Sequence, residues 1–124
     1  MKNKRREITA LTRIYDLILW IIPILEKFPR AQKFLLGDRI ETLLLDIMDL
    51  IIEATYSKQK APILKEANLK IEKARYLVRL VKDMRYLSTK RYGYIANCLN
   101  TIGAEIGGWL KYSESRQYKN NKNK

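Results

Sequence analysis

The sequence predicts an all-α protein that folds as an antiparallel up-down four-helix bundle. Apolar residues recur every three or four positions in four separate segments, which is the spacing of one helix face. Proline, serine and glycine residues stand between these segments, and no segment has the alternating pattern of a strand. With 124 residues, 47% of them hydrophobic, the chain is sized for one domain with one core. Four amphipathic helices with short connections pack most simply as a bundle.

The first helix is predicted over about residues 7–27. Its apolar residues lie on one face and are Ile8, Leu11, Tyr15, Ile18, Ile22 and Leu25. Pro23 falls inside this segment and can kink it, because proline removes one backbone hydrogen bond. The Phe28-Pro29 pair sets the boundary, since a residue before proline disfavours helical dihedral angles.

The second helix is predicted over about residues 30–56 and the third over about residues 62–87. The apolar face of the second helix consists of Leu36, Ile40, Leu43, Ile47, Leu50 and Ala54. The third helix carries Leu64, Ala67, Ile71, Ala74, Val78 and Val81 at the same spacing. Pro62 suits the first turn of the third helix, where its missing N–H would lack a partner in any case.

The fourth helix is predicted over about residues 89–111, with Ser88 or Thr89 as its N-cap. Its apolar face consists of Tyr92, Ile95, Leu99, Ile102, Ile106 and Trp109. Residues 1–112 therefore form the expected bundle. The polar, mostly basic residues 113–124 are expected to form a disordered tail.

Four glycines fall within the fourth helix, at positions Gly93, Gly103, Gly107 and Gly108. Each costs roughly 1 kcal/mol of helix propensity relative to alanine. Two explanations remain open. One is the close approach of another helix, within the bundle or between subunits, and the other is a helix end near Gly107-Gly108.

The composition excludes several enzyme classes. The chain has no histidine, so it lacks an imidazole base and the usual transition-metal ligand. A single cysteine, Cys98, forms neither an intramolecular disulfide nor a thiolate metal cluster. Carboxylate pairs such as Asp46/Asp49 have no further ligands beside them. We therefore expect no enzymatic activity, no catalytic residue, no cofactor and no metal site.

The apolar segments do not favour a membrane protein. The longest, residues 14–25, is interrupted by Asp16 and Pro23 and is shorter than the roughly 20 residues that span a bilayer. The basic N-terminus resembles a signal peptide, but Glu7 and Arg13 interrupt the apolar stretch, and no small-residue cleavage site follows. We expect a cytoplasmic protein without a membrane partner.

Positive charge is concentrated in the third helix and the start of the fourth. The chain carries 25 Lys and Arg against 13 Asp and Glu, a formal charge of +12. The residues expected to bind nucleic acid or a partner are Arg30, Arg75, Arg79, Lys82, Arg85, Lys90 and Arg91. Nearby tyrosines that could stack on unpaired bases are Tyr76, Tyr86, Tyr92 and Tyr94. The alternative is that these charges form solvated faces, or pair with the acidic face of the second helix.

Several short stretches resemble the accessory variability determinant (Avd) proteins of diversity-generating retroelements. They are Trp20-Ile-Ile-Pro23, Glu26-Lys-Phe-Pro-Arg30, Phe34-Leu-Leu-Gly37 with Arg39-Ile40, Glu66-Ala-Asn68, Arg79-Leu-Val-Lys-Asp83, Ile102-Gly103 and Gly107-Gly-Trp-Leu-Lys111. The likeness spans about residues 7–111. The second choice is a related family of four-helix-bundle proteins, encoded by intervening sequences in bacterial 23S ribosomal RNA genes.

The resemblance to Avd implies more than the residue pattern does. It implies a four-helix-bundle protomer, assembly into a barrel-shaped homopentamer, and no enzymatic activity. It also implies binding to the reverse transcriptase and to its template RNA, with DNA as a further candidate. The alternative expectation is an oligomeric interaction module without a polymerase partner, whose basicity serves solubility or an acidic protein.

Overall fold

The computed structural model describes the backbone of residues 2–122 and the side chains of residues 9–116, 118 and 119. Its elements are α1 (Lys2–Glu26), α2 (Arg30–Gln32), the π-helical segment η1 (Lys33–Gly37), α3 (Asp38–Tyr56), α4 (Lys60–Asp83) and α5 (Thr89–Lys122). The residues at both junctions of η1 keep right-handed helical angles, so α2, η1 and α3 form one continuous helical rod. The described chain therefore has four helical rods and no strand.

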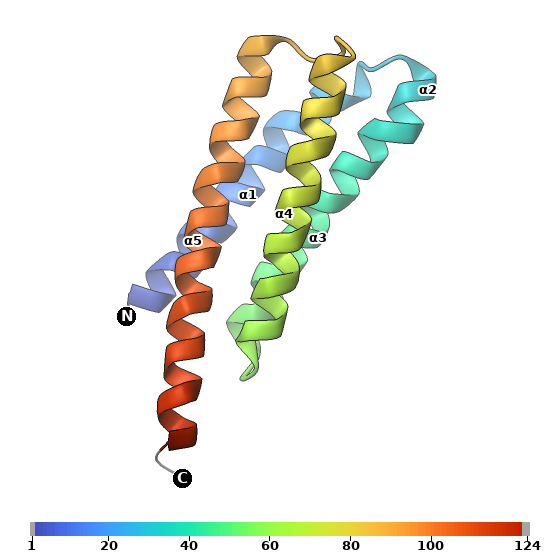
Figure 1. The fold of residues 1–124 in the computed structure, drawn as a ribbon. Coiled ribbons are helices and arrows are strands. Elements are labelled where there is room, and N and C mark those ends of the chain that lie inside the picture. Colours follow the sequence, from blue (N-terminus) through green and yellow to red (C-terminus); the bar gives the residue numbers. More distant parts are fainter. Residues whose placement is uncertain (1, 123–124) are drawn as a thin grey trace.

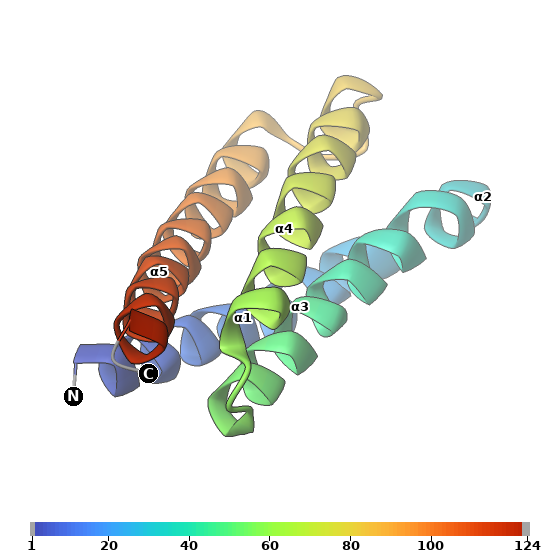
Figure 2. The ribbon, with the colours of Figure 1, turned by 60° about the horizontal axis from the view of Figure 1, so that its bottom comes forward.

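The four rods pack in sequence order around one core. The α1 rod packs against α3 and α5, and α4 packs against the same two helices from the other side. Successive rods run in opposite directions, and the chain ends at residues 2 and 122 lie at the same end of the bundle (Figure 1). Figure 2 shows the same arrangement with the molecule turned so that the bottom of the view in Figure 1 comes forward. The predicted all-α, up-down four-helix bundle is confirmed.

The core draws apolar side chains from every rod. Its fully buried large side chains are Ile14, Leu17, Ile21, Ile40, Leu44, Ile47, Ile51, Leu64, Ile71, Ile95, Leu99 and Trp109. Each such side chain contributes about 1.5–3 kcal/mol of transfer free energy. In α1 the buried line differs from the predicted face, because Tyr15 is exposed while Ile14 and Leu17 are buried. Apolar residues cover so much of α1 that periodicity alone does not fix which side faces the core.

The reversal between α4 and α5 begins earlier than predicted. The α4 helix ends at Asp83 instead of residue 87, and Arg85 follows with a positive φ of 68°. The Arg85 N–H donates to the carbonyl of Lys82, and the Tyr86 N–H donates to the carbonyl of Val81. These two hydrogen bonds define a Schellman motif, in which glycine normally takes the left-handed position. A left-handed arginine costs about 1–2 kcal/mol.

Ser88 caps the N-terminus of α5, so of the two predicted caps, Ser88 and Thr89, the structure selects Ser88. Its hydroxyl oxygen accepts a hydrogen bond from the backbone N–H of Arg91 at 3.1 Å. Its carbonyl accepts the N–H of Tyr92 at 2.9 Å, which starts the helical hydrogen-bond pattern. The cap satisfies one of the free donors of the first turn.

The end of α5 differs from the prediction. The helix continues to Lys122, so residues 113–122 of the expected disordered tail are helical, and residues 123–124 lie outside the described part. No proline or glycine follows Gly108, so nothing in the backbone stops the helix. The Lys65 ammonium on α4 lies 3.8 Å from the Glu114 carboxylate and adds an ion pair to this extension. The last turns of α5 extend beyond the neighbouring rods (Figure 1).

Of the two explanations for the glycines, the close approach of another helix applies at Gly103. A Cβ added there would stand 3.0 Å from Nη2 of Arg75 on α4, so the glycine makes room for a guanidinium. A Cβ added at Gly93 would meet no described atom within 4 Å outside its own helix. The α5 helix also continues through Gly107 and Gly108, so no helix end lies there.

We expect Gly93→Ala to raise the free energy of unfolding by about 1 kcal/mol, since alanine favours the helix and has space at this position. Gly103→Ala should gain less, because the new methyl group displaces the Arg75 guanidinium. Urea denaturation of the two variants measures the difference. A destabilised Gly93→Ala variant would contradict this expectation and indicate that a second chain packs against Gly93.

Candidate functional site

Two chain reversals lie at the same end of the bundle. The segment 27–29 joins α1 to α2, and the segment 84–88 joins α4 to α5 (Figure 1). Because the rods alternate in direction, these reversals come together although they are far apart in the sequence. Five of the predicted site residues belong to these two turns and the helix ends beside them. We call this set the basic end, and it consists of Arg30, Lys82, Arg85, Lys90 and Arg91.

The basic end retains most of its positive charge. Among the described side chains, Arg30, Arg85, Lys90 and Arg91 form no ion pair with a carboxylate. All four residues are exposed. The first turn of α5 contains no acidic residue, so the positive end of the helix dipole adds to this charge. The basic end is therefore an electropositive surface, accessible to an anionic partner.

Lys82 connects the basic end to the rest of α4. Its ammonium lies 3.7 Å from the Asp83 carboxylate and 5.4 Å from the ring centre of Tyr92. Arg79 approaches the same carboxylate at 3.9 Å. Two cations thus share one exposed carboxylate, and such exposed pairs contribute about 0–1 kcal/mol each. Net positive charge remains along this part of α4.

Arg75 has a different environment from the other predicted site residues. Its guanidinium pairs with Glu72 on the same helix and packs over Gly103 of α5. Its side chain is 34% exposed, and its Nε is buried without a hydrogen-bond partner. Arg75 therefore packs between two helices, and part of its charge is compensated within the chain.

The four tyrosines named from the sequence also separate into two groups. Tyr86 and Tyr92 are half-buried against the core. Tyr76 is 70% exposed and Tyr94 is 46% exposed, so these two present ring faces to solvent.

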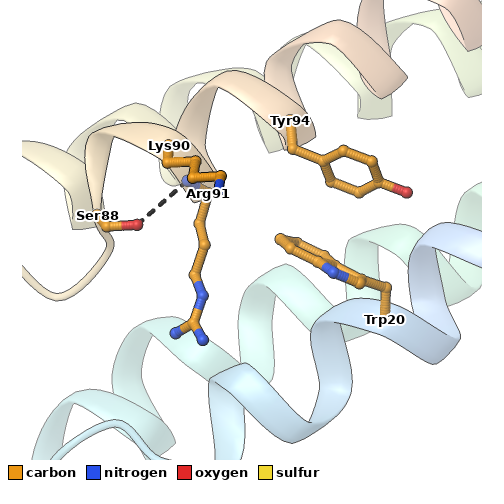
Figure 3. Close-up of a pocket in the computed structure, with 5 residues that line it drawn as sticks. All are labelled: Trp20, Ser88, Lys90, Arg91 and Tyr94. Carbon is orange, nitrogen blue, oxygen red and sulfur yellow. Dashed lines mark hydrogen bonds between the residues drawn. The ribbon is translucent and has the colours of Figure 1, made fainter.

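Sequence reasoning missed a pocket beside the basic end. It lies between α1 and α5, has a volume of about 430 Å³, and is lined by Trp20, Ser88, Lys90, Arg91 and Tyr94 (Figure 3). The ring centres of Trp20 and Tyr94 are 4.5 Å apart, with their planes tilted by 49°. The sequence contained both aromatic residues but gave no sign of their proximity, because only the packing of α1 on α5 joins them.

The charge of this pocket comes from its two cations. A hydrogen bond to the Cys98 side chain raises the pKa of the Tyr94 hydroxyl above its ordinary value of 10.0. Tyr94 therefore stays neutral at physiological pH. Lys90 and Arg91 supply the positive side of the pocket, and the two aromatic rings supply the apolar side.

Two further features are absent from the described part of the chain. No group of three or more His, Cys, Asp or Glu side chains there is placed to hold a metal ion. None of the described helices combines the length and the apolar character that crossing a bilayer requires.

Comparisons with known proteins bear on the family. The family model described as bAvd-like matches residues 8–113, which is most of the chain. A search of curated proteins gives no match. The resemblance to Avd proteins expected from the sequence is thereby confirmed, and the chain belongs to the bAvd-like family.

Proposed function

We propose that this protein is a non-catalytic, cytoplasmic accessory protein of a diversity-generating retroelement. It binds the reverse transcriptase and the template RNA, and supports mutagenic cDNA synthesis. The observation that carries this proposal is the bAvd-like match over residues 8–113, in a chain whose basic end has four cations that form no ion pair with a described carboxylate. The proposal assigns nucleic-acid binding to the basic end.

The physics of phosphate binding supports this assignment. Arginine and lysine bind phosphates with little sequence preference, and the released counterions make the affinity fall steeply with salt. Exposed cations without carboxylate partners repel one another in the free protein, and a polyanion relieves this repulsion. Arg75 contributes less to such a surface because Glu72 compensates part of its charge.

The conformation of Arg85 gives an independent reason. A left-handed position in a Schellman motif is most stable with glycine, yet the chain has an exposed arginine there. An arginine at this position lowers the folding stability relative to glycine, and it places a cation at the tip of the turn. This exchange is typical of residues kept for function.

Self-association is a further part of the proposal. The family resemblance implies a homopentamer, and the described surface of α3 and α4 has apolar residues that a neighbouring subunit could cover. They are Leu45, Ile52, Tyr56, Leu69, Tyr76 and Leu80. In a pentamer the basic end would be repeated five times, which would raise the avidity for one long RNA without new contacts.

We expect an Arg85→Ala/Lys90→Ala/Arg91→Ala variant to lose most of its affinity for a structured RNA. A plot of log affinity against log salt concentration has a negative slope, and each lost phosphate contact should reduce the magnitude of this slope by about 0.7–0.9. Fluorescence anisotropy at several salt concentrations measures both effects. The matched control is Lys58→Ala/Lys73→Ala/Lys111→Ala, which removes the same charge from exposed positions elsewhere. Equal losses in both variants would mean that net charge, and not the basic end, determines binding.

The polymerase contact is tested separately. A tagged cognate reverse transcriptase should retain this protein on an affinity resin, with or without the RNA. Failure of retention in both conditions would overturn the accessory role. If this protein binds RNA but the tagged polymerase does not retain it, the result favours the alternative without a polymerase partner, such as a protein of the related ribosomal intervening-sequence type.

Arg85→Gly separates stability from binding. We expect the variant to raise the free energy of unfolding by about 1 kcal/mol, because glycine adopts the left-handed conformation without a Cβ penalty. The same substitution should weaken RNA binding, since it removes an exposed cation. Thermal denaturation and anisotropy measure the two effects on one sample. Unchanged RNA affinity would remove Arg85 from the interface.

A further inference from the structure

We propose that the pocket between α1 and α5 binds one unpaired nucleotide of the bound strand, with the base against Trp20 and the phosphate at Lys90 and Arg91. This inference rests on the proposed nucleic-acid binding and assigns a specific task to one part of that surface. It implies a preference for single-stranded or looped RNA over a continuous duplex.

The shape of the pocket fits a small planar group linked to an anion. Its volume of about 430 Å³ lies within the roughly 300–1,000 Å³ of pockets that hold small molecules. Figure 3 shows the rings of Trp20 and Tyr94 on one side, and the side chain of Arg91 extending away from α5 on the other. The lining is mostly apolar, and it includes two cationic residues beside the two aromatic rings.

The polar groups of the pocket select an anion. Neither Lys90 nor Arg91 forms an ion pair with a described carboxylate, so both are available to a ligand. The Ser88 hydroxyl caps the Arg91 N–H within the chain, and the first turn of α5 adds a positive dipole. A free phosphate ion would use the cations and leave the rings uncovered. A nucleotide uses both sides, because it joins a flat aromatic base to a phosphate.

The preference for unpaired bases follows from what an aromatic platform can reach. In a duplex both faces of each base are stacked on neighbouring bases, so the protein reaches the strand backbone and the base edges in the grooves but no base face. In a loop or single strand a base can leave the stack and lie on an aromatic side chain. Because the platform accepts any base, this contact adds affinity for unpaired RNA without strong sequence selection.

The test compares a short single-stranded RNA with the same RNA annealed to its complement. We expect Trp20→Leu to weaken single-strand binding by about tenfold and to leave duplex binding nearly unchanged. Trp20→Tyr should restore most of the single-strand affinity, because it keeps an aromatic face. The matched control is Tyr15→Leu, which removes an exposed aromatic ring of α1 outside the pocket lining. Circular dichroism checks that each variant is folded.

Tryptophan fluorescence gives a second readout in the unmodified protein. The chain has two tryptophans, and Trp109 is fully buried, whereas Trp20 lines the pocket. Single-stranded RNA should therefore quench the Trp20 emission, and the Trp20→Leu variant should show no such quenching.

The outcomes distinguish failure of the nucleotide pocket from failure of the proposed function. If structured RNA still binds but Trp20→Leu affects neither strand preference nor quenching, the nucleotide pocket is overturned and the proposed function stands. If Trp20→Leu weakens retention by the polymerase and leaves RNA binding intact, the pocket binds protein and the inference is overturned. If no nucleic acid binds at any salt concentration, both proposals fail.

Discussion

The burial of four apolar helix faces in one core requires successive rods to run antiparallel, and the rest of the molecule follows from this constraint. Alternating directions bring the first and third reversals to one end of the bundle and the second reversal to the other. Residues near position 30 and residues 82–91 therefore become neighbours (Figure 1). Residues 82–91 are held together locally by the Schellman motif and the Ser88 cap. Arg30 is brought to them by the packing of the rods around a core that contains none of these cations.

The charged residues fall into two classes according to whether the chain compensates them. Arg13 pairs with Glu105 across α1 and α5, and Lys70 pairs with Asp46 across α4 and α3. These ion pairs lie along the helix contacts. At the basic end, by contrast, every cation except Lys82 is exposed and forms no ion pair with a described carboxylate, and Arg85 adopts a costly backbone conformation. The proposed anionic partner would neutralise this surface and offset its cost in stability.

The pocket illustrates how a helix contact can create a chemical environment. Trp20 lies in the C-terminal half of α1, and Tyr94 lies in the second turn of α5. Their rings meet because α1 and α5 pack side by side, and the N-terminus of α5 brings two cations to the same place. The nucleotide proposal depends on this combination, since neither the aromatic pair nor the cations alone would select a nucleotide over other ligands.

The sequence by itself determined the four helices, their order, a cap at Ser88 or Thr89 and the Avd resemblance, because helix periodicity, capping chemistry and short motifs are local properties. It also identified the basic residues, but not which of them are compensated. Only the tertiary structure separated Arg75, packed over Gly103, from the cations of the basic end. The same holds for the left-handed Arg85, the extended α5 and the Trp20–Tyr94 pocket. The Trp20–Tyr94 pocket and the packing of Arg75 depend on contacts between residues far apart in the chain, so residue spacing along one helix does not encode them. The extent of α5 and the conformation of Arg85 are local, but apolar periodicity carries no signal for either.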